Sequence, residues 1–516
     1  MDIFSTPIRD KDPEGGRFET VSFDNPSIIT EKAIHNDDFY AGDTWYTKLQ
    51  RAAGKLGVEE RGIERVPSDE RTDTSASKMA TVWLSANMVV SSFAVGAIGI
   101  TIFGLGFVEA ALTIFFINVL GILPNCFFAT FGPRFGLRQM VLSRFYFGYY
   151  GVKIAAMVNV IICIGWSSVN VIVGAQLFHA INSDMPGWAG ILLIAILTLI
   201  ICVFGYRIVH VYERYAWIPI FIIFLIVLGQ FAHSGEFDTL LPLRTGTASA
   251  GSVLSFAGAI YGFGSGWCVV AADYTVYQPV SRSRVSVFFW TFSGLIFPLL
   301  FAQLLGAAVA TATVHNPEFQ TNYAESGIGG LFSTVLIPPF GRFGEFCLAI
   351  LALSITANNC PNIYSVSLSL QVLAQKTQNI PRFVWTCIAT GIYIAISIPG
   401  YDRFHAWLEN FMLIIAYWLG IYEGIALSEH FVFRRGFGGY IPEDYTNPSA
   451  LPPGIAATLA ICFGVLGTVL GMSQVWFTGP ISKLAGNGDI GFELAFGFSS
   501  VVYIALRAVE KSYFGR

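Results

Sequence analysis

Charged residues are scarce in this sequence and unevenly spread. Asp, Glu, Lys and Arg make up 12% of its 516 residues, compared with about 25% in soluble domains. Hydrophobic residues make up 54%, and the mean hydropathy is +0.60. Residues 1–78 hold 11 Lys/Arg and 16 Asp/Glu, whereas the other 438 residues share only 37 charges. This distribution excludes an ordinary soluble protein and predicts a polar tail in front of a membrane-embedded body.

The sequence also lacks the motifs of metal sites, disulfide frameworks and ATP-driven pumps. Its eight cysteines are isolated in apolar segments, and no pair has metal-ligand spacing. No Gly-x-x-x-x-Gly-Lys-Ser/Thr phosphate loop is present. The polar tail contains no long apolar run, so we expect no cleavable signal peptide. We predict that the protein is not an enzyme and has no catalytic residue, metal or resident cofactor.

Long apolar segments are what the sequence does contain. A helix that spans a bilayer needs about 20 mostly apolar residues, and twelve segments qualify. They start near Met79, Phe107, Gly151, Trp188, Tyr212, Gly251, Val285, Phe343, Phe383, Phe404, Pro453 and Gly491. We therefore expect an all-α membrane protein with twelve transmembrane helices, surrounded by membrane lipid.

The basic residues alternate between the connections of these segments. With the N-terminus inside, the inner connections and the C-terminus hold 15 Lys/Arg, whereas the outer connections hold 4. Lys/Arg bias sets orientation, so we expect both termini to be cytosolic. Twelve helices with short connections favour a secondary transporter. A channel is the competing class, but the filter loop or rings of like charge typical of channels are not recognisable.

Two segments are rich in glycine at positions where a helix could break. The first, Ser85–Ile100, contains Gly96 and Gly99, and a break or close helix packing explains these equally well. In the sixth, Ser255–Tyr274, we favour a break, because concentrated glycine weakens a helix and lets backbone approach a ligand. The glycines that define this break are Gly262, Gly264 and Gly266.

Broken helices beside the substrate are typical of transporters built from inverted repeats. The first and sixth segments occupy corresponding places if segments one to five and six to ten are two such repeats. The expected divisions are a largely disordered cytosolic tail over 1–78, a transporter core over 79–435 with repeats at about 79–232 and 250–433, two further helices over 451–507 and a cytosolic C-terminus over 508–516.

The eighth segment carries an unusual density of amide side chains. Its polar residues step by four, four, three and four positions, which places them on one face of a helix; they are Ser354, Asn358, Asn362, Ser365 and Ser369, with Asn359 on the flank. Pro361 has no N–H, so we expect it to interrupt the helix and free the carbonyl of Ala357. An interhelical hydrogen-bond seam is the alternative. We favour a binding site, because amides this dense exceed what packing needs.

Eight motifs, in order from about Met79 to Arg516, carry a family resemblance. They are SANMVVSSFAVGAIG, FGLRQMVLSRF, GWSSVN, FGYRIVHVYERYAWIP, AADYTVY, ANNCPN, SEHFVFRR and the ending GDIGFELAF with YFGR. Together they resemble the fungal purine-cytosine permeases of the nucleobase:cation symporter-1 family. The resemblance implies the five-plus-five inverted-repeat fold of bacterial amino-acid and hydantoin symporters, here with two further C-terminal helices. It also implies uptake of cytosine, adenine, guanine and hypoxanthine together with protons.

The same resemblance implies a binding site for a flat base. In relatives the heterocycle lies between a tryptophan of helix three and one of helix six, and polar side chains contact it. The matching positions here are Trp166 and Trp267, with Asn170, Asn358, Asn359, Asn362 and Ser92 as polar contacts. Stacking on an aromatic ring is worth roughly 1–3 kcal/mol per base. An amide can donate to and accept from a base edge, so we expect the asparagines to set selectivity.

Ionisable groups at membrane depth are functional candidates by default, because burying them there is costly. The resemblance makes Glu213, at the inner start of helix five, our first candidate for proton coupling or gating. The alternative is a surface ion pair with a neighbouring arginine. Asp273, just past the expected break in helix six, is second, with anchoring at the inner interface as its alternative. Three further carboxyls are interpreted as structural or peripheral: Glu345, Glu409 and Glu423.

The hydroxyl pattern of helix eight bears on the coupling ion. Sodium-coupled relatives place adjacent Ser and Thr one to two turns before the asparagine. The corresponding positions here are near Ala352 and Leu353, and hydroxyls occur only at Ser354 and Thr356. This difference favours a proton over sodium.

Three functions are open on the sequence. The first is a proton-coupled symporter that imports purines and cytosine across the plasma membrane. The second is a transporter of the same family for allantoin, uracil or thiamine. The third is a channel or a nutrient sensor that binds without moving its solute. All three take a small heterocycle as partner and none involves nucleic acid.

Overall fold

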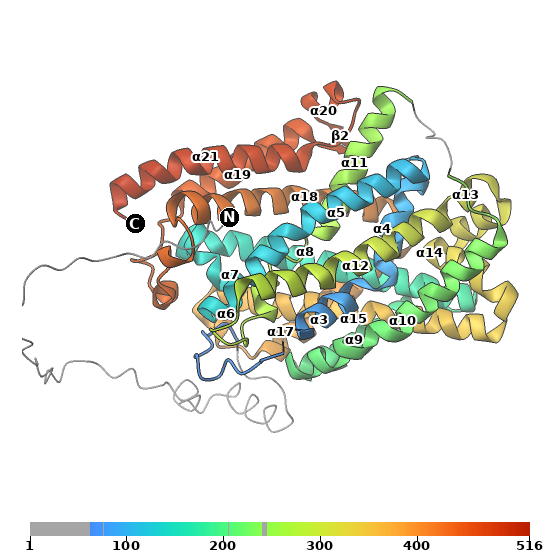
Figure 1. Ribbon diagram of the computed structural model, residues 1–516, viewed down its shortest axis with the longest axis horizontal. Coiled ribbons are helices and arrows are strands. Elements are labelled where there is room, and N and C mark those ends of the chain that lie inside the picture. The colour runs from blue at the N-terminus through green and yellow to red at the C-terminus, as the bar shows by residue number, and fades with distance from the viewer. Residues whose placement is uncertain (1–61, 76, 205, 240–244) are drawn as a thin grey trace, which may run out of the picture. The chain divides into compact units, whose positions relative to one another are not determined.

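The computed structural model describes residues 62–516 except for 76, 205 and 240–244; the side chains of 204, 206–213, 375 and 405–407 also lie outside the description. Most of these residues are helical (Figure 1). The first helices are α3 (Ser77–Asn87), α4 (Val90–Thr101), α5 (Phe107–Ala129), α6 (Phe131–Phe135), α7 (Gln139–Leu142), α8 (Arg144–Ile181), α9 (Gly187–Phe204) and α10 (Tyr206–Ser234). Next come α11 (Thr247–Gly264), the 3-10 turn η1 (Ala271–Tyr274), α12 (Arg284–Ala310), α13 (Ala312–His315), α14 (Pro317–Phe340), α15 (Arg342–Leu373) and α16 (Gln375–Gln378). The last are α17 (Arg382–Gly400), α18 (Phe404–Ser428), the π-helical turn η3 (Glu429–Phe433), α19 (Ile455–Gly471), α20 (Pro480–Leu484) and α21 (Gly491–Phe514).

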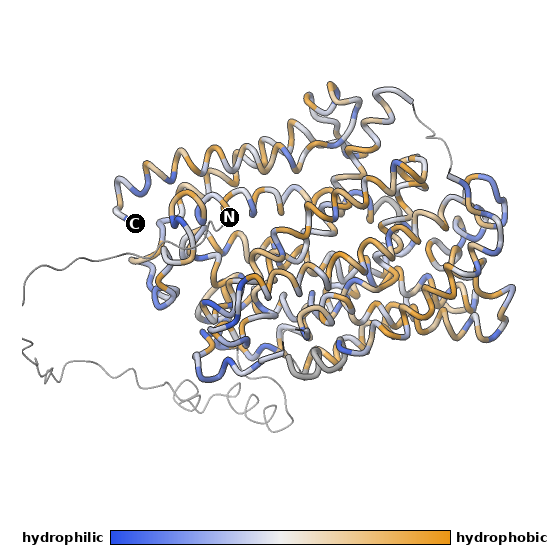
Figure 2. Tube along the Cα trace, viewed as in Figure 1, coloured by the Kyte–Doolittle hydropathy of each residue, from blue (hydrophilic) through white to orange (hydrophobic). Residues whose placement is uncertain are grey.

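The long helices have the composition of membrane-spanning segments. In the described part of the chain, eight helices are long and apolar enough to cross a bilayer, and α3 with α4 adds a ninth if the bent pair is one span. Two shorter apolar helices accompany them, Gly187–Val203 and Ile455–Gly471. Hydrophobic residues run along the helices, while hydrophilic ones gather in the connections at their ends (Figure 2). The structure therefore confirms a mostly helical, strongly apolar bundle, and the count of twelve spans stays a prediction.

The outer helices turn apolar side chains outward and polar ones inward. On α5, Phe116 is 62% exposed and Leu120 is 50% exposed, whereas Asn118 and Asn125 are fully buried. A soluble protein reverses this arrangement, so such a face is suited to lipid. The inward asparagines bond to other helices: the Asn125 amide donates to the carbonyl of Gly264 at 2.7 Å.

Three helices form the centre of the bundle. In their most apolar stretches, 78% of the residues of α8, 78% of α15 and 83% of α18 are buried, compared with 33% for α5. α8 and α15 pack along each other, α12 packs on α3 and α4, and α11 packs on α5 and α18. α19 and α21 pair with each other and lie against α18.

The first span is bent by 54° between α3 and α4. The interruption falls at Met88 and Val89, before the glycines of this segment rather than at them. A side chain at Gly96 would overlap the backbone of Gln303 on α12, and one at Gly99 would meet the ring of Phe256 on α11. These two glycines therefore allow close helix packing, the second of the two interpretations of this segment. The break in the first span lies at Met88 and Val89 instead.

The sixth span breaks inside its glycine-rich stretch. α11 continues through Gly262 and ends at Gly264, and Ser265 is its C-cap. Turns follow over 266–270, and η1 restores one helical turn from Ala271. The polypeptide between the two pieces is therefore non-helical in the interior of the bundle, where glycine adopts such conformations at least cost.

The eighth span is not interrupted at Pro361. α15 runs from Arg342 to Leu373 with the proline inside it, so the expected break at this position is wrong. A proline removes one hydrogen bond of the helix, and neighbouring helices allow proline to be tolerated in a span. Here α15 is largely buried in the bundle and packs on α8, α14 and α17.

α14 is a helix that the sequence interpretation missed. Asn316 caps it, because its side-chain oxygen accepts the backbone N–H of Glu318 at 2.8 Å. The helix bends at Gly327, where φ is 55°, and it packs against α8 and α15. Its first turns are too polar for a membrane span, although the Asn-Pro-Glu start is a recognisable helix N-terminus.

The end of the predicted polar tail packs on the helical body. Ile63 and Val66 are buried. The backbone N–H of Val66 donates to Gly136 at 2.8 Å, and that of Asp73 donates to Tyr277 at 3.0 Å. Residues 62–75 of the predicted tail therefore pack against the helical body. Residues 1–61 lie outside the described part, and a largely disordered tail over 1–78 stays a prediction.

Candidate functional site

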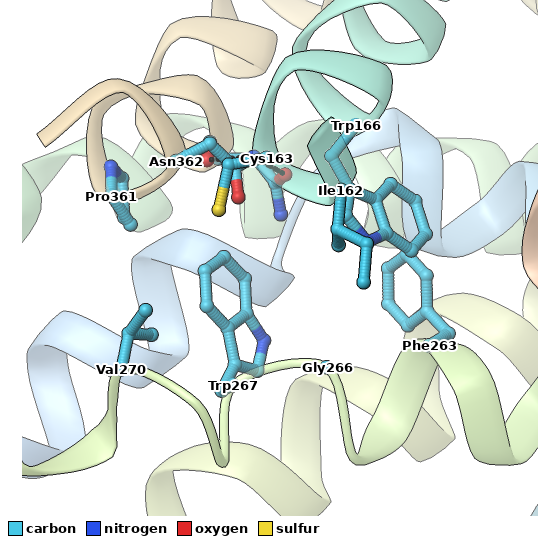
Figure 3. A pocket seen from close by; sticks show the side chains of 10 residues that line it. Ile162, Cys163, Trp166, Phe263, Gly266, Trp267, Val270, Pro361 and Asn362 are labelled. Carbon is cyan, nitrogen blue, oxygen red and sulfur yellow. Dashed lines mark hydrogen bonds between the residues drawn. The ribbon is translucent and has the colours of Figure 1, made fainter. Parts of the chain in front are cut away.

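A pocket lies where α8, the break after α11 and the middle of α15 meet (Figure 3). Its lining is mostly apolar and aromatic, with amide groups on one side. The lining residues are Ile162, Cys163 and Trp166 from α8, Phe263, Gly266, Trp267 and Val270 from the sixth span, and Asn358, Pro361 and Asn362 from α15. The pocket therefore collects six residues that the sequence singled out from three distant segments.

Each of the two tryptophans is fixed by its own set of neighbours. Trp166 meets Phe263 edge to face, with ring centroids 5.1 Å apart at 76°, and Phe411 at 5.6 Å and 74°. Trp267 packs on Trp83 at 5.5 Å, and its indole N–H donates to the side-chain oxygen of Asn87 at 3.1 Å. In Figure 3 the two indoles border different sides of the pocket. Each indole is thus oriented by at least one contact outside the pocket lining: Phe411 for Trp166, and Trp83 with Asn87 for Trp267.

The amide side of the pocket is formed by Asn358 and Asn362. The Asn362 amide nitrogen donates to the backbone oxygen of Asn358 at 3.1 Å. The Asn358 amide nitrogen donates to the carbonyl of Ala86 at 2.5 Å, which ties α15 to the last turn of α3 beside the first break. Asn358 therefore contacts the pocket and a helix end at the same time.

Asn170 and Asn359 lie behind this wall, outside the lining. The Asn170 amide nitrogen donates to Asn358 Oδ1 at 2.6 Å and to Asn359 Oδ1 at 2.9 Å. Its oxygen accepts from the hydroxyl of Ser91 at 2.6 Å. Two donated bonds and one accepted bond occupy most of what an amide offers. This group is an interhelical seam outside the pocket lining, and the direct contact of Asn170 and Asn359 with a solute stays a prediction.

The serines near the first break also serve the backbone. The hydroxyl of Ser92 donates to the carbonyl of Asn87 at 2.6 Å, and Ser92 is fully buried outside the pocket lining. It stabilises the turn between α3 and α4 instead of lining the pocket. Its neighbour Ser91 is the one that joins the amide seam.

The three serines of the polar stripe on α15 have different kinds of hydrogen-bond partner. Ser365 and Ser369 both accept from the amide of Asn159 on α8, at 3.1 Å and 2.8 Å. Ser354 donates within its own helix, to Leu351 at 2.6 Å. Both interpretations of the stripe therefore apply, because its middle borders the pocket and its end is a seam with α8.

Asp273 lies in η1 and is 3% exposed. Its carboxylate accepts the backbone N–H of Gln139, the first residue of α7, at 2.7 Å. The guanidinium of Arg138 donates to the Asp273 backbone carbonyl at 2.9 Å. These bonds anchor the second half of the broken span to the connection before α8. The backbone of Glu213 lies in α10, but its side chain is outside the described residues.

The structure adds residues that the sequence interpretation did not select. Ile162 and Cys163 precede Trp166 by about one helical turn, so helical spacing could have grouped all three. Phe263 belongs to the glycine-rich stretch and touches Trp166. Trp83 and Asn87 hold Trp267 although they lie in α3, a relation that only the folded chain reveals.

The chemistry of the pocket is that of a receptor for a flat, neutral and polar ring. Indole faces offer stacking surfaces, and the amides offer donors and acceptors. In the ranges that the structure describes, no three His, Cys, Asp or Glu side chains are grouped to hold a metal ion. The room open to the centre of a water molecule is about 20 Å³, and one water needs roughly 10–15 Å³ on this measure. A ring system therefore enters only when the walls move apart.

Comparisons with known proteins agree with this picture. Residues 65–490 match the family described as permease for cytosine/purines, uracil, thiamine, allantoin. The chain is 53% identical over 509 residues to the purine-cytosine permease fcyB of Emericella nidulans, covering 97% of this chain and 100% of that protein. It is 43% identical over 480 residues to the purine-cytosine permease FCY2 of Saccharomyces cerevisiae, covering 92% and 89%. The solved inward-facing conformation of Mhp1 matches with a TM-score of 0.65 at 13% identity, over 88% of this chain and 96% of that one.

Proposed function

Because the chain belongs to the family of permeases for cytosine and purines, uracil, thiamine and allantoin, we propose that it imports cytosine, adenine, guanine and hypoxanthine as a proton symporter. The protein is a multi-pass membrane transporter and not an enzyme, with the fold of Mhp1-like transporters. The pocket between Trp166, Trp267 and the α15 amides carries the proposal. Nucleobases are flat, neutral and rich in donors and acceptors, which is the chemistry that this pocket complements.

In the proposed complex the base stacks against the indoles of Trp166 and Trp267. Stacking tolerates every base, because each has a π-face. Asn358 and Asn362 then meet the base edge, and their donor and acceptor pattern sets selectivity. Asn170, Asn359 and Ser91 would act indirectly, because their bonds orient Asn358. This division accounts for one pocket that takes both a pyrimidine and purines.

We propose that ten of the helices form two repeats of five. In this scheme α3/α4, α5, α8, α9 and α10 correspond to α11/η1, α12, α15, α17 and α18. The packing supports it: α3 and α4 pack on α12 as α11 packs on α5, and α3 packs on α10 as α11 packs on α18. The equivalent pairs α8–α15, α9–α17 and α5–α12 also pack together. With α19 and α21 added, the scheme has twelve spans.

The scheme gives a route for alternating access. Both breaks, in the first and sixth spans, lie at corresponding positions and meet through the bond between Trp267 and Asn87. Rocking one repeat against the other would open the pocket first to one side and then to the other. We propose that Asp273 and Glu213 act in this gating, Asp273 through its hold on α7.

The proposed orientation places both termini in the cytosol at the plasma membrane. Two pairs of arginines support this orientation, because the two members of each pair contact the same residue. Arg138 and Arg382 both lie over the ring of Tyr364, and Arg434 and Arg507 both bond to Glu429. Cytosolic connections carry the excess of Lys and Arg in membrane proteins.

Uptake of radiolabelled cytosine tests the proposal. Cells that lack their own permeases for these bases would express the chain, and unlabelled adenine, guanine, hypoxanthine, uracil, allantoin and thiamine would compete. We expect saturable cytosine uptake that the purines inhibit and that an uncoupler abolishes. Uptake of uracil, allantoin or thiamine without cytosine would replace the substrate, and binding without accumulation would indicate a sensor.

A further inference from the structure

A buried carboxyl on α18 faces the break of the sixth span. Glu423 is 1% exposed. Its Oε2 accepts from the hydroxyl of Tyr261 on α11, and its Oε1 accepts from the hydroxyl of Ser265, the C-cap of α11. The thiol of Cys268 faces the same carboxyl. All three partners are neutral. Tyr261 lies in the last turn of α11, and Ser265 and Cys268 lie in the break that follows it.

A second buried carboxyl, Glu429 in the turn η3 that follows α18, has the cationic partners that Glu423 lacks within the described residues. Glu429 is fully buried too, but Arg434 approaches it to 2.8 Å and Arg507 to 3.2 Å. Across the described ranges, no Lys, Arg or His forms an ion pair with Glu423. A buried carboxylate without a cation is costly, whereas a protonated carboxyl can donate one hydrogen bond and accept another. Hydroxyl partners suit both forms, because a hydroxyl donates and accepts.

Other titratable groups around α18 are engaged elsewhere. On α21, Tyr503 and Arg507 bond to Glu429, and Glu493 interacts with Asp489. The hydroxyl of Tyr422 on α18 meets Gln139 and Ser143. On α8, Tyr146 interacts with Tyr440, Tyr422 and Arg434. Glu423 therefore faces Tyr261, Ser265 and Cys268 as its own immediate set.

The position of this set connects Glu423 to the pocket. Ser265 is followed by Gly266 and Trp267, which both line the pocket. A movement that opens the pocket on the side of the sixth span displaces Ser265, and with it one of the two hydroxyls that hold the carboxyl. Protonation of Glu423 and the conformation of the break are then thermodynamically linked, each shifting the other.

We propose that Glu423 is the group that carries the co-transported proton, with Tyr261 and Ser265 as positioning residues. This inference rests on the proposed function as a proton symporter. The Glu423 carboxylate takes a proton from water on the outer side, stays neutral while the pocket is closed around the base, and returns the proton to water on the inner side. The cycle moves one proton and involves no redox or covalent change.

The test compares accumulation with exchange in Glu423→Gln, using the full chain in cells without their own permeases. Glutamine keeps the shape and hydrogen bonds of a protonated carboxyl but cannot release a proton. A driving force of 100 mV supports roughly fortyfold accumulation for each proton. We expect the variant to lower the accumulation ratio of cytosine from about this value to about 1. Exchange of labelled for unlabelled cytosine should continue, and uptake should no longer respond to external pH. Glu345→Gln is the matched control and should keep both activities.

Further variants keep the test decisive if Glu423→Gln fails to reach the cell surface. Tyr261→Phe removes one of the two hydroxyls, and we expect coupled uptake with a displaced pH midpoint. Glu423→Asp should recover pH-dependent accumulation in part. Unchanged accumulation and pH dependence in Glu423→Gln, or an unchanged midpoint in Tyr261→Phe, would overturn the inference. So would loss of coupling in Glu213→Gln with normal coupling in Glu423→Gln. If the unaltered chain moves no base at all, the proposed function itself fails.

Discussion

The side chains that border the pocket are held with different firmness. Trp166 lies between Phe263 and Phe411, and edge-to-face contacts with both rings hold its indole. In the described structure, the amide nitrogen of Asn362 donates only within its own helix, to the backbone oxygen of Asn358 at 3.1 Å and to its side-chain oxygen at 3.5 Å. A side chain held by bonds within one helix can turn toward an entering base edge without breaking a bond to another helix. In the proposed complex, the stacking side of the pocket is therefore held firmly, whereas the amide side can adapt to the edge of the base.

Asn362→Ala should raise the KM for cytosine roughly 5- to 150-fold, because a polar edge left unpaired in the pocket costs about 1–3 kcal/mol. Initial rates of uptake across a range of cytosine concentrations, normalised to the amount of protein at the surface, measure this. Ser367→Ala on the same helix is the control, since Ser367 donates to the backbone oxygen of Tyr364 in its own helix and lies outside the pocket lining. An unchanged KM in Asn362→Ala would remove this residue from the site.

Trp166→Ala should weaken cytosine and adenine binding alike, by the roughly 1–3 kcal/mol that base–aromatic stacking contributes. Trp166→Phe should recover part of the loss, because a smaller ring still stacks. Competition by both bases in the same cells gives the comparison. A variant that loses one base and keeps the other would show that Trp166 reads identity and does not simply stack.

The helical elements owe their close approach to small residues. α4 meets α12 at Gly96, where the space for a side chain is taken by the backbone of Gln303. The glycine here brings two backbones together, as small residues do at helix interfaces in membranes. Because α4 is the second half of a broken span, this contact fixes α4 against α12 next to the break.

Gly96→Ala should lower the stability of the protein by about 1–3 kcal/mol, the usual cost of overpacking a tight contact. Gly391→Ala on α17 is the matched control, since no atom lies within 4 Å of the added carbon. The melting temperature of each variant in detergent provides the measurement. Equal melting temperatures for the two variants would mean that α4 and α12 separate readily.

A second joint links the ends of α11, α18 and α21 through Asp489. Its carboxylate accepts from the hydroxyl of Tyr417 and from the backbone N–H groups of Ser473 and Gly491. Its own N–H donates to Ser255 at 2.9 Å. Burial raises the pKa of Asp489 from 3.8 to about 6, against these hydrogen bonds, which lower it.

This pKa predicts a pH dependence of stability with a definite sign. Between about pH 4 and pH 6 the folded protein holds a proton on Asp489 that the unfolded chain has released, so stability rises as pH falls through this window. From pH 7.5 to pH 4.5 the unaltered protein should gain about 2 kcal/mol relative to Asp489→Asn, which cannot titrate. Melting temperatures of both proteins at the two pH values test this. A constant difference between them would contradict the raised pKa.

At the scale of the whole molecule, the sequence predicted individual helices and the break in the sixth span better than the contacts between helices. Apolar length located the helices, and the density of glycine located the break after Gly264. Periodicity put Asn358 and Asn362 on one face of α15, but it could not say that Asn170 and Asn359 would bond to each other behind that face. Partners across helices depend on packing, and periodicity within one helix carries no information about its neighbours.

Other features escaped for equally physical reasons. α14 is too polar to count as a span, so its Asn316 cap and Pro317 start were its only signals. Residues 62–75 are charged in composition, yet the guanidinium of Arg71 bonds to the carbonyls of Val66, Pro133 and Phe135. Composition shows that such a segment is charged, but it does not show which backbone carbonyls will accept hydrogen bonds from its arginines.

Cys163 gives the pocket a chemical reporter of its own. It is the one cysteine that lines the pocket in the described structure, and it is buried there beside Trp166. With the exposed Cys387 and Cys462 replaced by serine, a small thiol-reactive probe should label Cys163 only when the walls part. Saturating cytosine should slow that labelling, and applying the probe from each side of the membrane would show which side the pocket opens to. Labelling that bound base leaves unchanged would place the base elsewhere.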